Sequence, residues 1–314
     1  IVQASSTNYS TLVGQSAEAS FTTTAAAPIV WFSQSSTWTT PIAASPPIRA
    51  NSASYIADIL TNASVIGFPN DTWAPTVWEA APTDPVITVT LTLDANDTSL
   101  WQTIIANATA AGYNQVRMPA AAVPTGSNDS WVSIYDATYV WEMFKAVKTD
   151  ATHWSAQMVR RWTRSGQGTV PVYDLYGSAW RCATSARLQG TVTKDEIDKG
   201  QVLHTLVFGY FGEVDGNHWG EYPCRQFVNG INTRTWAMNA GYKVQLDPTF
   251  NVDALSVTPA TKVVLKALQT YGMIFSYNNA VGSNAVVRES ATGKAWNWTG
   301  VFSTIPASVI NAMR

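Results

Sequence analysis

Apolar and polar residues alternate along several stretches of the chain, with the period of two that is typical of strands buried on one face. From Val86 to Leu93, Val and Leu alternate with Thr over most of the run. Residues 131–135 and 139–144 flank Asp136-Ala137-Thr138, a pattern that predicts a hairpin with a short turn. Two further strands are predicted over residues 202–208 and 273–277.

Helical patterns are fewer, and they are predicted over residues 52–60, 100–110 and 259–271. The third is the best marked, because Thr258 is a suitable N-cap, Pro259 suits the first turn and Gly272 suits the end. The balance predicts a mainly β fold, an antiparallel β-sandwich or a jelly-roll-like arrangement with a few short helices.

Domain organisation is predicted from a change of composition near Pro28. Residues 1–28 are rich in Ser, Thr and Ala, and we expect an extended N-terminal arm there. Residues 29–314 are expected to form a single β-rich domain. It begins with an aromatic stretch from Trp31 that several prolines keep out of regular helix, which predicts a structured loop.

Charge and polarity narrow the classes of partner. The formal net charge is −2, only 13% of residues are charged, and no run of Lys or Arg occurs, so nucleic acid is not an expected partner. No apolar stretch approaches the roughly 20 residues that a membrane-spanning helix needs.

Low charge with many Ser, Thr and Asn residues is typical of proteins outside the cell, so we expect a secreted protein whose leader has been removed. Asn-x-Ser/Thr sequons, which could carry glycans, occur at Asn8, Asn62, Asn70, Asn96, Asn107, Asn128 and Asn297. In an oxidising compartment Cys182 and Cys224 would form one disulfide, worth about 3–4 kcal/mol in the chain-entropy model. The alternative is two separate buried thiols.

Several enzyme classes are excluded by missing motifs. The chain has no Gly-x-Ser-x-Gly elbow, P-loop, dinucleotide-binding glycine pattern or His-Glu-x-x-His. Its 3 histidines are widely spaced and have no local pairing, so no zinc site is expected. No cofactor is predicted.

Two ionisable residues lie on apolar strand faces. Glu142 shares a face with Val140 and Phe144, and His204 shares one with Leu206. Burial would shift the pKa of each, and an acid and a base held in this way could transfer protons. The alternative is a core Glu and a core His that hydrogen bonds satisfy.

Polar and aromatic residues concentrate between residues 174 and 225, a mixture that suits a sugar site. Aromatic faces can stack on a sugar ring, while carboxylates and arginines hold hydroxyl or uronate groups. The catalytic candidates there are Asp174, Glu213, Asp215 and Glu221, and the substrate-binding candidates are Trp180, Arg181, Trp219, Tyr222 and Arg225. The alternative is a solvated long loop with ordinary ion pairs, tied down by the cysteines. Glu196 has the spacing from Thr193 of a capping box, so its predicted role is structural.

Sequence blocks distributed in order along most of the chain resemble a family of secreted proteins that is widespread in bacteria and fungi. The blocks are Trp38-Thr39-Thr40-Pro41-Ile42, Met118-Pro119 with Val123-Pro124, Trp141-Glu142-Met143-Phe144, Asp195-Glu196-Ile197 with Gly200 and His204, Leu246-Asp247-Pro248-Thr249-Phe250, and Ala267-Leu268-Gln269-Thr270-Tyr271-Gly272-Met273. The resemblance implies a secreted, β-rich, one-domain protein, and Glu142, His204 and Asp247 fall within its blocks. It implies no particular reaction. Where similar proteins are Gly-rich, this chain has Arg160-Arg161-Trp162-Thr163-Arg164.

These observations favour a secreted carbohydrate-active protein, either a glycoside hydrolase or a polysaccharide lyase acting on an extracellular glycan. In a hydrolase, Glu142 would be the acid and one of the other carboxylates its partner. In a lyase, His204 or a tyrosine would be the base, with Arg181 or Arg225 neutralising a uronate. The alternative is a non-catalytic glycan-binding protein, or an extracellular structural protein that assembles into oligomers.

Overall fold

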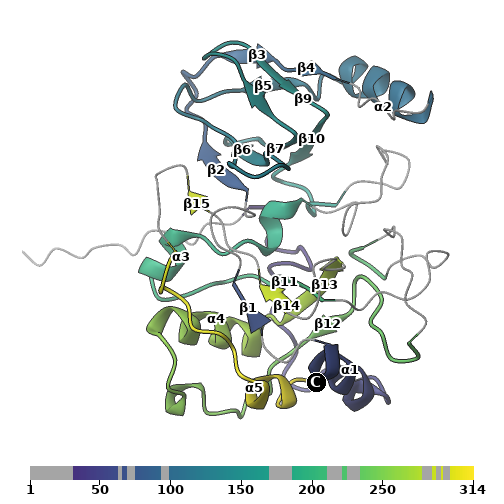
Figure 1. The fold of residues 1–314 in the computed structure, drawn as a ribbon, viewed down its shortest axis with the longest axis vertical. Coiled ribbons are helices and arrows are strands. Elements are labelled where there is room, and N and C mark those ends of the chain that lie inside the picture. The colour runs from purple at the N-terminus through teal and green to yellow at the C-terminus, as the bar shows by residue number, and fades with distance from the viewer. Residues whose placement is uncertain are drawn as a thin grey trace, which may run out of the picture.

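The computed structural model describes residues 31–62, 66–68, 75–92, 99–169, 186–210, 221–224, 234–277, 285–287, 291–292 and 298–314. These residues form two lobes stacked along the long axis of the molecule (Figure 1). The upper lobe contains the described residues between 75 and 169. The lower lobe contains most of those before residue 69 and after residue 185, but Trp31 and Phe32 pack with the upper lobe and residues 291–292 join its main sheet.

The main sheet of the upper lobe has the strand order β10-β7-β6-β2-β15. Its strands are β10 (Met158–Thr163), β7 (Tyr139–Phe144), β6 (Val132–Tyr135), β2 (Thr76–Glu79) and β15 (Ala291–Thr292). The predicted hairpin between β6 and β7 is confirmed, and Asp136 closes its turn by accepting the backbone N–H groups of Thr138 and Tyr139 at 2.7 and 2.8 Å.

Two smaller sheets and one helix complete the upper lobe. They are β3 (Val86–Thr88) with β5 (Gln115–Arg117), β4 (Thr90–Leu91) with β9 (Trp154–Ala156) and β8 (Val147–Lys148), and α2 (Ser99–Ala110). The single strand predicted from Val86 onwards is interrupted at Val89, whose N–H bonds to Asn114. The break lets the chain change partner, since β3 pairs with β5 and β4 pairs with β9.

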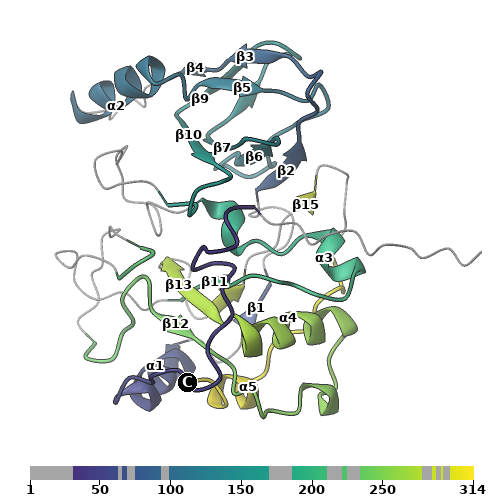
Figure 2. The ribbon, with the colours of Figure 1, turned by 180° about the vertical axis from the view of Figure 1, so that it is seen from behind.

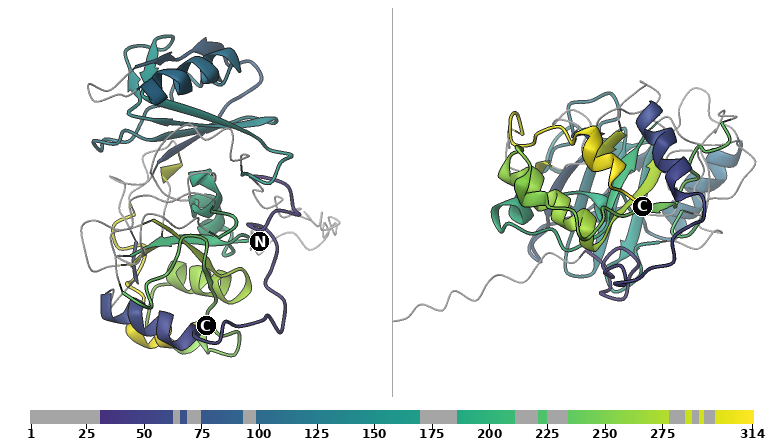
Figure 3. Two further views of the ribbon diagram at one scale, coloured as in Figure 1. Left: turned by 90° about the vertical axis from the view of Figure 1, so that its right-hand side faces the viewer. Right: turned by 90° about the horizontal axis from the view of Figure 1, so that it is seen from below.

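The lower lobe is built on a sheet with the strand order β1-β14-β11-β13-β12. Its strands are β1 (Ile66–Gly67), β14 (Ala285–Val287), β11 (Leu206–Gly209), β13 (Met273–Tyr277) and β12 (Lys243–Val244). Three helices cover the face that points away from the upper lobe: α1 (Ser52–Asn62), α4 (Pro259–Thr270) and α5 (Ala307–Asn311) (Figures 1 and 3). Short helical segments are η2 (Arg187–Gly190), α3 (Lys194–Asp198) and η3 (Val252–Ala254).

Helix α4 shows how closely local sequence sets an element's ends. Thr258 caps it by accepting the N–H of Thr261, and Pro259 occupies the first turn. Gly272 follows with φ of 71°, a left-handed conformation that glycine adopts without steric cost. This helix is confirmed, as are the predicted helices α1 and α2.

Three of the four sheets formed by the described residues are mixed, so the expectation of an antiparallel arrangement is wrong. Strands β11 and β13 run parallel, and so do β2 and β6. Parallel neighbours need a long crossover connection. Between β11 and β13 that connection carries β12 and α4. The presence of several β-sheets with few short helices is confirmed, whereas the sandwich or jelly-roll packing and the single domain stay predictions.

Alternation along the strands divides each lobe into two apolar layers. In β11 and β13, Leu206 and Met273 face the helices, whereas Val207 and Ile274 pack with Trp38 on the opposite face. In β7, Trp141 belongs to the core of the upper lobe, while the face of Val140 packs with Leu188 of η2. The second apolar layer of the upper sheet therefore lies at the junction of the lobes.

The segment from Trp31 to Ile42 crosses this junction, which Figure 2 shows from behind. Trp31 and Phe32 are buried with the upper lobe, and Trp38 is buried with the lower sheet. The N–H of Ile42 bonds to the carbonyl of Thr270, at the end of α4. The predicted structured loop is confirmed here, while the arm over residues 1–28 lies outside the described residues.

In the part of the chain that the structure describes, no helix is both long and apolar enough to cross a membrane.

Candidate functional site

The structure describes some of the residues predicted to form a site, namely Glu142, His204, Glu221, Tyr222 and Cys224. The others lie outside the described residues: Asp174, Trp180, Arg181, Cys182, Glu213, Asp215, Trp219 and Arg225. Cys224 is fully buried, and its predicted bridge to Cys182 stays a prediction.

Glu142 lies at the junction of the lobes and is only 2% exposed. Its Oε1 accepts the backbone N–H of Leu188 at 2.9 Å, at the start of η2. Arg160 of β10 stands opposite Glu142 in register. Burial raises the pKa of Glu142, while backbone N–H groups of Arg187 and Leu188 and the two arginine charges oppose that rise. Glu142 therefore agrees with the alternative of a core carboxylate that hydrogen bonds satisfy. Its bond to Leu188 connects the upper sheet to η2.

His204 is also buried, but it precedes β11 instead of lying within a strand. The N–H of Thr205 bonds to Trp38, so the chain enters the sheet only at Leu206, and the predicted strand over residues 202–208 begins later than expected. The Nδ1 of His204 bonds to the carbonyl of Thr205 at 2.9 Å, and the Nε2 of His204 lies 3.0 Å from Oε1 of Glu196. That second contact is within ion-pair distance but lacks the angle of a hydrogen bond.

Glu196 also forms the predicted capping box of α3. Its Oε2 accepts the N–H of Thr193, and the Thr193 hydroxyl accepts the N–H of Glu196. Burial alone would lower the pKa of His204, but Glu196 and the backbone carbonyls of Thr205 and Thr191 raise it above its ordinary value. One buried carboxylate therefore caps a helix and neutralises a buried imidazolium.

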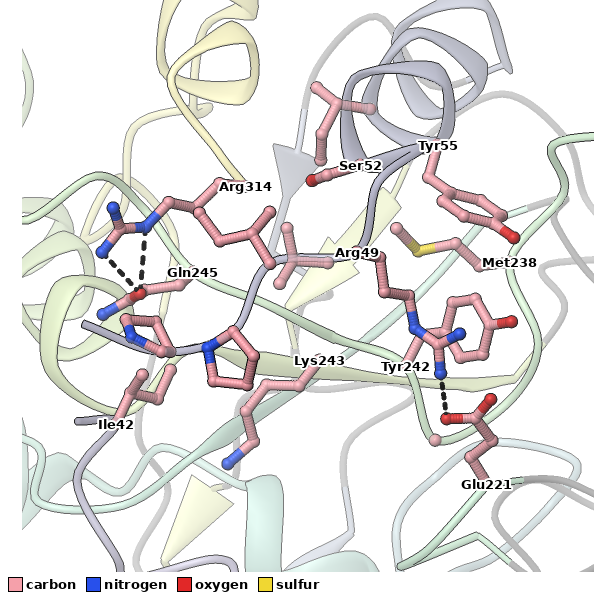
Figure 4. Close-up of a pocket in the computed structure, with 16 residues that line it drawn as sticks. Ile42, Arg49, Ser52, Tyr55, Glu221, Met238, Tyr242, Lys243, Gln245 and Arg314 are labelled. Carbon is pink, nitrogen blue, oxygen red and sulfur yellow. Dashed lines mark hydrogen bonds and ion pairs between the residues drawn. The ribbon is translucent and has the colours of Figure 1, made fainter. Parts of the chain in front are cut away.

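Glu221 has a different setting, because it lines an open pocket of about 300 Å³ in the lower lobe (Figure 4). The walls come from the segment before α1, from α1 itself and from β12 with the residues around it. The lining residues are Ile42, Pro46, Pro47, Ile48, Arg49, Ser52, Tyr55, Ile56, Glu221, Met238, Gly241, Tyr242, Lys243, Val244, Gln245 and Arg314. Neither Glu142 nor His204 is among them.

An ion pair and a row of aromatic rings form one end of this pocket. Arg49 pairs with Glu221, and its guanidinium lies 4.2 Å from the centre of the Tyr242 ring. Tyr55 meets Tyr242 edge-on at 5.3 Å and Trp236 edge-on at 5.7 Å. The side chains of Arg49 and Glu221 are 53% and 46% exposed, so a ligand can reach both charges. Burial and a bond to Tyr55 raise the pKa of Tyr242 to about 12, so its phenol stays protonated at neutral pH.

A partly buried cluster behind the aromatic row fixes helix α1 against the opposite wall. Arg234 donates to both oxygens of Asp58, at 2.6 and 2.9 Å. Tyr210 donates to Asp58 at 3.1 Å and accepts the N–H of Met238 at 2.8 Å. Because Asp58 lies one turn beyond Tyr55, the cluster sets the distance between Tyr55 and Met238 across the pocket.

The backbone of Glu221 packs against Gly241, and any other residue at position 241 would displace it. Gly241 has φ of +98°, and a Cβ added there would lie 1.9 Å from the carbonyl oxygen of Glu221. The N–H of Glu221 bonds to Ala240, and the N–H of Gly241 bonds to Phe275 in β13. The close approach places Glu221 at the rim of the pocket.

Replacing Gly241 with alanine is therefore expected to lower the free energy of unfolding by at least ~1 kcal/mol, because the new methyl group needs both a strained backbone and a displaced Glu221. Urea denaturation of G241A measures the effect. G200A is the matched control, since Gly200 also has positive φ (+71°) but open space around it. Equal losses in the two variants would show that the contact with Glu221 contributes nothing.

The other end of the pocket is polar. Arg314 donates through Nε and Nη2 to Oε1 of Gln245, at 3.2 and 3.1 Å. Lys243 donates to Oγ1 of Thr205 at 3.1 Å and to the carbonyl of Thr37 at 3.2 Å. Although much of the Lys243 side chain is exposed, desolvation lowers its pKa to about 8.

Sequence reasoning identified Glu221 but missed most of its surroundings, including Arg49, Tyr55, Tyr242, Lys243 and Arg314. No local pattern distinguishes these residues, because the pocket joins segments far apart in the chain. Tyr222, predicted to bind substrate, follows Glu221 and is 48% exposed, but it does not line the pocket.

The described residues offer no group of three or more His, Cys, Asp or Glu side chains that could hold a metal ion.

Comparisons of the chain with protein-family models, with curated proteins and with solved structures found no match. The resemblance to a widespread secreted family therefore stays a prediction.

Proposed function

We propose that this chain is a secreted, carbohydrate-directed protein that binds a saccharide in the pocket between α1 and β12. The observation that carries the proposal is the set of polar and aromatic groups at one end of the pocket. Arg49 and Glu221 offer charged donors and acceptors for hydroxyl groups. Tyr242 carries the Arg49 guanidinium over its ring, and Tyr55 beside it offers ring surface for a sugar face. A volume of about 300 Å³ lies at the lower end of the range for small-ligand sites.

Secretion and glycosylation are part of the same proposal. Two of the sequon asparagines, Asn107 on α2 and Asn128, are exposed, as glycan attachment requires. A sandwich or jelly-roll packing of the sheets also belongs to the proposal, since lectin domains use that architecture.

The described lining of the pocket has one carboxylate, which favours binding without cleavage. Glu221 is the only acidic residue in its described lining, and its carboxylate is paired with Arg49. Hydrolysis of a glycosidic bond normally needs two carboxyl groups that flank it. Cleavage by a hydrolase or a lyase is the second candidate function, and Glu221 is the described carboxylate best placed to contact a substrate.

Replacing Tyr242 with alanine is expected to weaken saccharide binding about tenfold, the equivalent of about 1.4 kcal/mol, because it removes the ring that holds the Arg49 guanidinium in the pocket. The test is calorimetric titration of oligosaccharides from plant, fungal and bacterial polysaccharides that bind the unmodified protein in a first screen. Y113A is the matched control, because Tyr113 is also half-buried and has an arginine over its ring, but it lies in the upper lobe. Equal affinity of Y242A and the unmodified protein would place the binding site elsewhere.

The same screen separates binding from catalysis. New reducing ends would identify a hydrolase, and absorbance from unsaturated uronates would identify a lyase. Binding without either product is the expected result. A protein that neither binds nor cleaves any member of the panel would contradict the proposed function, and light scattering would then test the structural alternative by detecting large oligomers.

A further inference from the structure

The pocket has an excess of positive charge that the rest of the protein does not share. Arg49, Lys243 and Arg314 line it, and among the described lining residues only Glu221 carries an opposing side-chain charge. The formal net charge of the whole chain is −2. A positive pocket on a weakly acidic protein selects ligands of negative charge, because local charges dominate the potential inside a concave site.

The three cations are distributed along the length of the pocket. Figure 4 shows Arg314 and Arg49 at opposite ends, and the side chain of Lys243 starts between them and points away from both. They therefore match a ligand that carries its negative groups at intervals better than one with a single charge at its tip.

Most of this positive charge is not neutralised inside the pocket. Arg314 donates to the neutral amide oxygen of Gln245, and Lys243 donates to neutral oxygens of Thr205 and Thr37. Hydrogen bonds from Thr249 are the main cause of the lowered pKa of Asp247, and the charge of Arg314 lowers it further, but Asp247 does not line the pocket. Arg49 pairs with Glu221, and the exposure of both side chains lets a ligand anion share that guanidinium.

We infer that the ligand of the pocket is an acidic saccharide, whose carboxylate or sulfate groups are held by Lys243 and Arg314 and at the far end by Arg49. This inference rests on the proposed function and specifies its ligand class. Charge-assisted hydrogen bonds to carboxylate or sulfate oxygens supply the affinity, and contact with Tyr55, beside the Arg49 guanidinium that lies over Tyr242, supplies the selection for a sugar ring.

The protonation state of Lys243 agrees with this role. With a pKa of about 8, its amine is mostly cationic at neutral pH. The groups closest to its nitrogen are the uncharged oxygens of Thr205 and Thr37, so no carboxylate in direct contact competes with a ligand for it.

The test compares trisaccharides that carry carboxylate, methyl ester or sulfate groups. Trigalacturonate, its methyl ester and a sulfated trisaccharide are titrated calorimetrically into the full-length protein and into the variants K243Q and R314Q. Lys199→Gln is the matched control, because it removes one positive charge from an exposed position at the end of α3, outside the pocket. Circular dichroism confirms that each variant is folded.

The expected result is that at least one acidic probe binds about tenfold or more tightly than the neutral ester, and that K243Q and R314Q each lose about tenfold in affinity for it while K199Q does not. The preferred acidic probe identifies the ligand's anionic group. Equal binding of the ester and the acids, or variants that match K199Q, would overturn the acidic ligand and leave saccharide binding in place. Failure of every probe and of neutral oligosaccharides would contradict both proposals.

Discussion

Replacing Glu196 with glutamine is expected to lower the free energy of unfolding by about 3 kcal/mol, because it leaves a buried imidazolium without its counter-charge. The side chains of His204 and Glu196 are only 4% and 6% exposed, so water cannot replace the lost partner. Glutamine still suits the third position of a capping box, so the loss reports the ion pair and not the cap. Chemical denaturation at pH 6 measures it.

The same pair sets the sign of a pH dependence. The pKa of His204 is raised above its ordinary 6.5 in the folded protein. The contribution of His204 to the free energy of unfolding is therefore complete below pH 6.5 and is lost as pH rises through the folded pKa. Burial is already the largest single influence on the pKa of His204, and in E196Q the charge of Glu196 no longer opposes it, so the pKa falls. The contribution of His204 then falls as the solution becomes more acidic, so the slope of stability against pH near neutrality changes sign.

Asp198→Asn is the control for this experiment. Asp198 lies in the same helix and pairs with Lys194, but on the exposed surface. A surface pair of this kind is worth about 0–1 kcal/mol, with no sign change near neutral pH. If the stability of E196Q and that of the unmodified protein depended on pH in the same way, Glu196 and His204 would not form an ion pair in solution.

Replacing Glu142 with glutamine is expected to cost about 2–3 kcal/mol of unfolding free energy, because Arg160 and Arg187 lose the carboxylate that faces them at the junction. Arg160 remains cationic at neutral pH, although desolvation lowers its pKa to about 10. Urea denaturation measures the loss. Glu79→Gln is the matched control on the exposed end of β2, where a change below about 0.5 kcal/mol is expected.

This result bears directly on the prediction that Glu142 is a catalytic acid. If E142Q is destabilised but keeps full saccharide binding and any turnover, Glu142 is a structural residue of the junction. A variant with unchanged stability and lost turnover would support the catalytic role instead.

Local sequence predicted the elements whose ends are fixed by neighbouring residues. Thr258, Pro259 and Gly272 define α4, and Asp136 defines the turn between β6 and β7, because caps and turns depend on backbone groups only a few residues away. The alternation of β7 also predicted that Glu142 is buried. It could not show what Glu142 contacts, since Leu188 and Arg187 lie far along the chain.

The pocket could not be predicted, because the segments that form it are far apart in the chain. Its walls come from residues 42–56, from Glu221, from residues 238–245 and from Arg314, and only the fold brings them together. Parallel pairing was missed because an alternating strand has the same pattern whichever way its neighbour runs. One predicted site residue, Glu221, does line the pocket, and its predicted catalytic role stays a prediction.

The route of the chain through the two lobes has a consequence for synthesis. The described residues from β2 to β10 form nearly all of the upper lobe from one continuous stretch, so its contacts can form soon after that stretch leaves the ribosome. Helix α1 is made earlier, yet Ile56 and Ile59 share their core with Val309 and Ile310 of α5. The first helix of the lower lobe must therefore keep an apolar face without its partner until the last helix is made, and during that interval the nascent chain is most exposed to aggregation and to capture by chaperones.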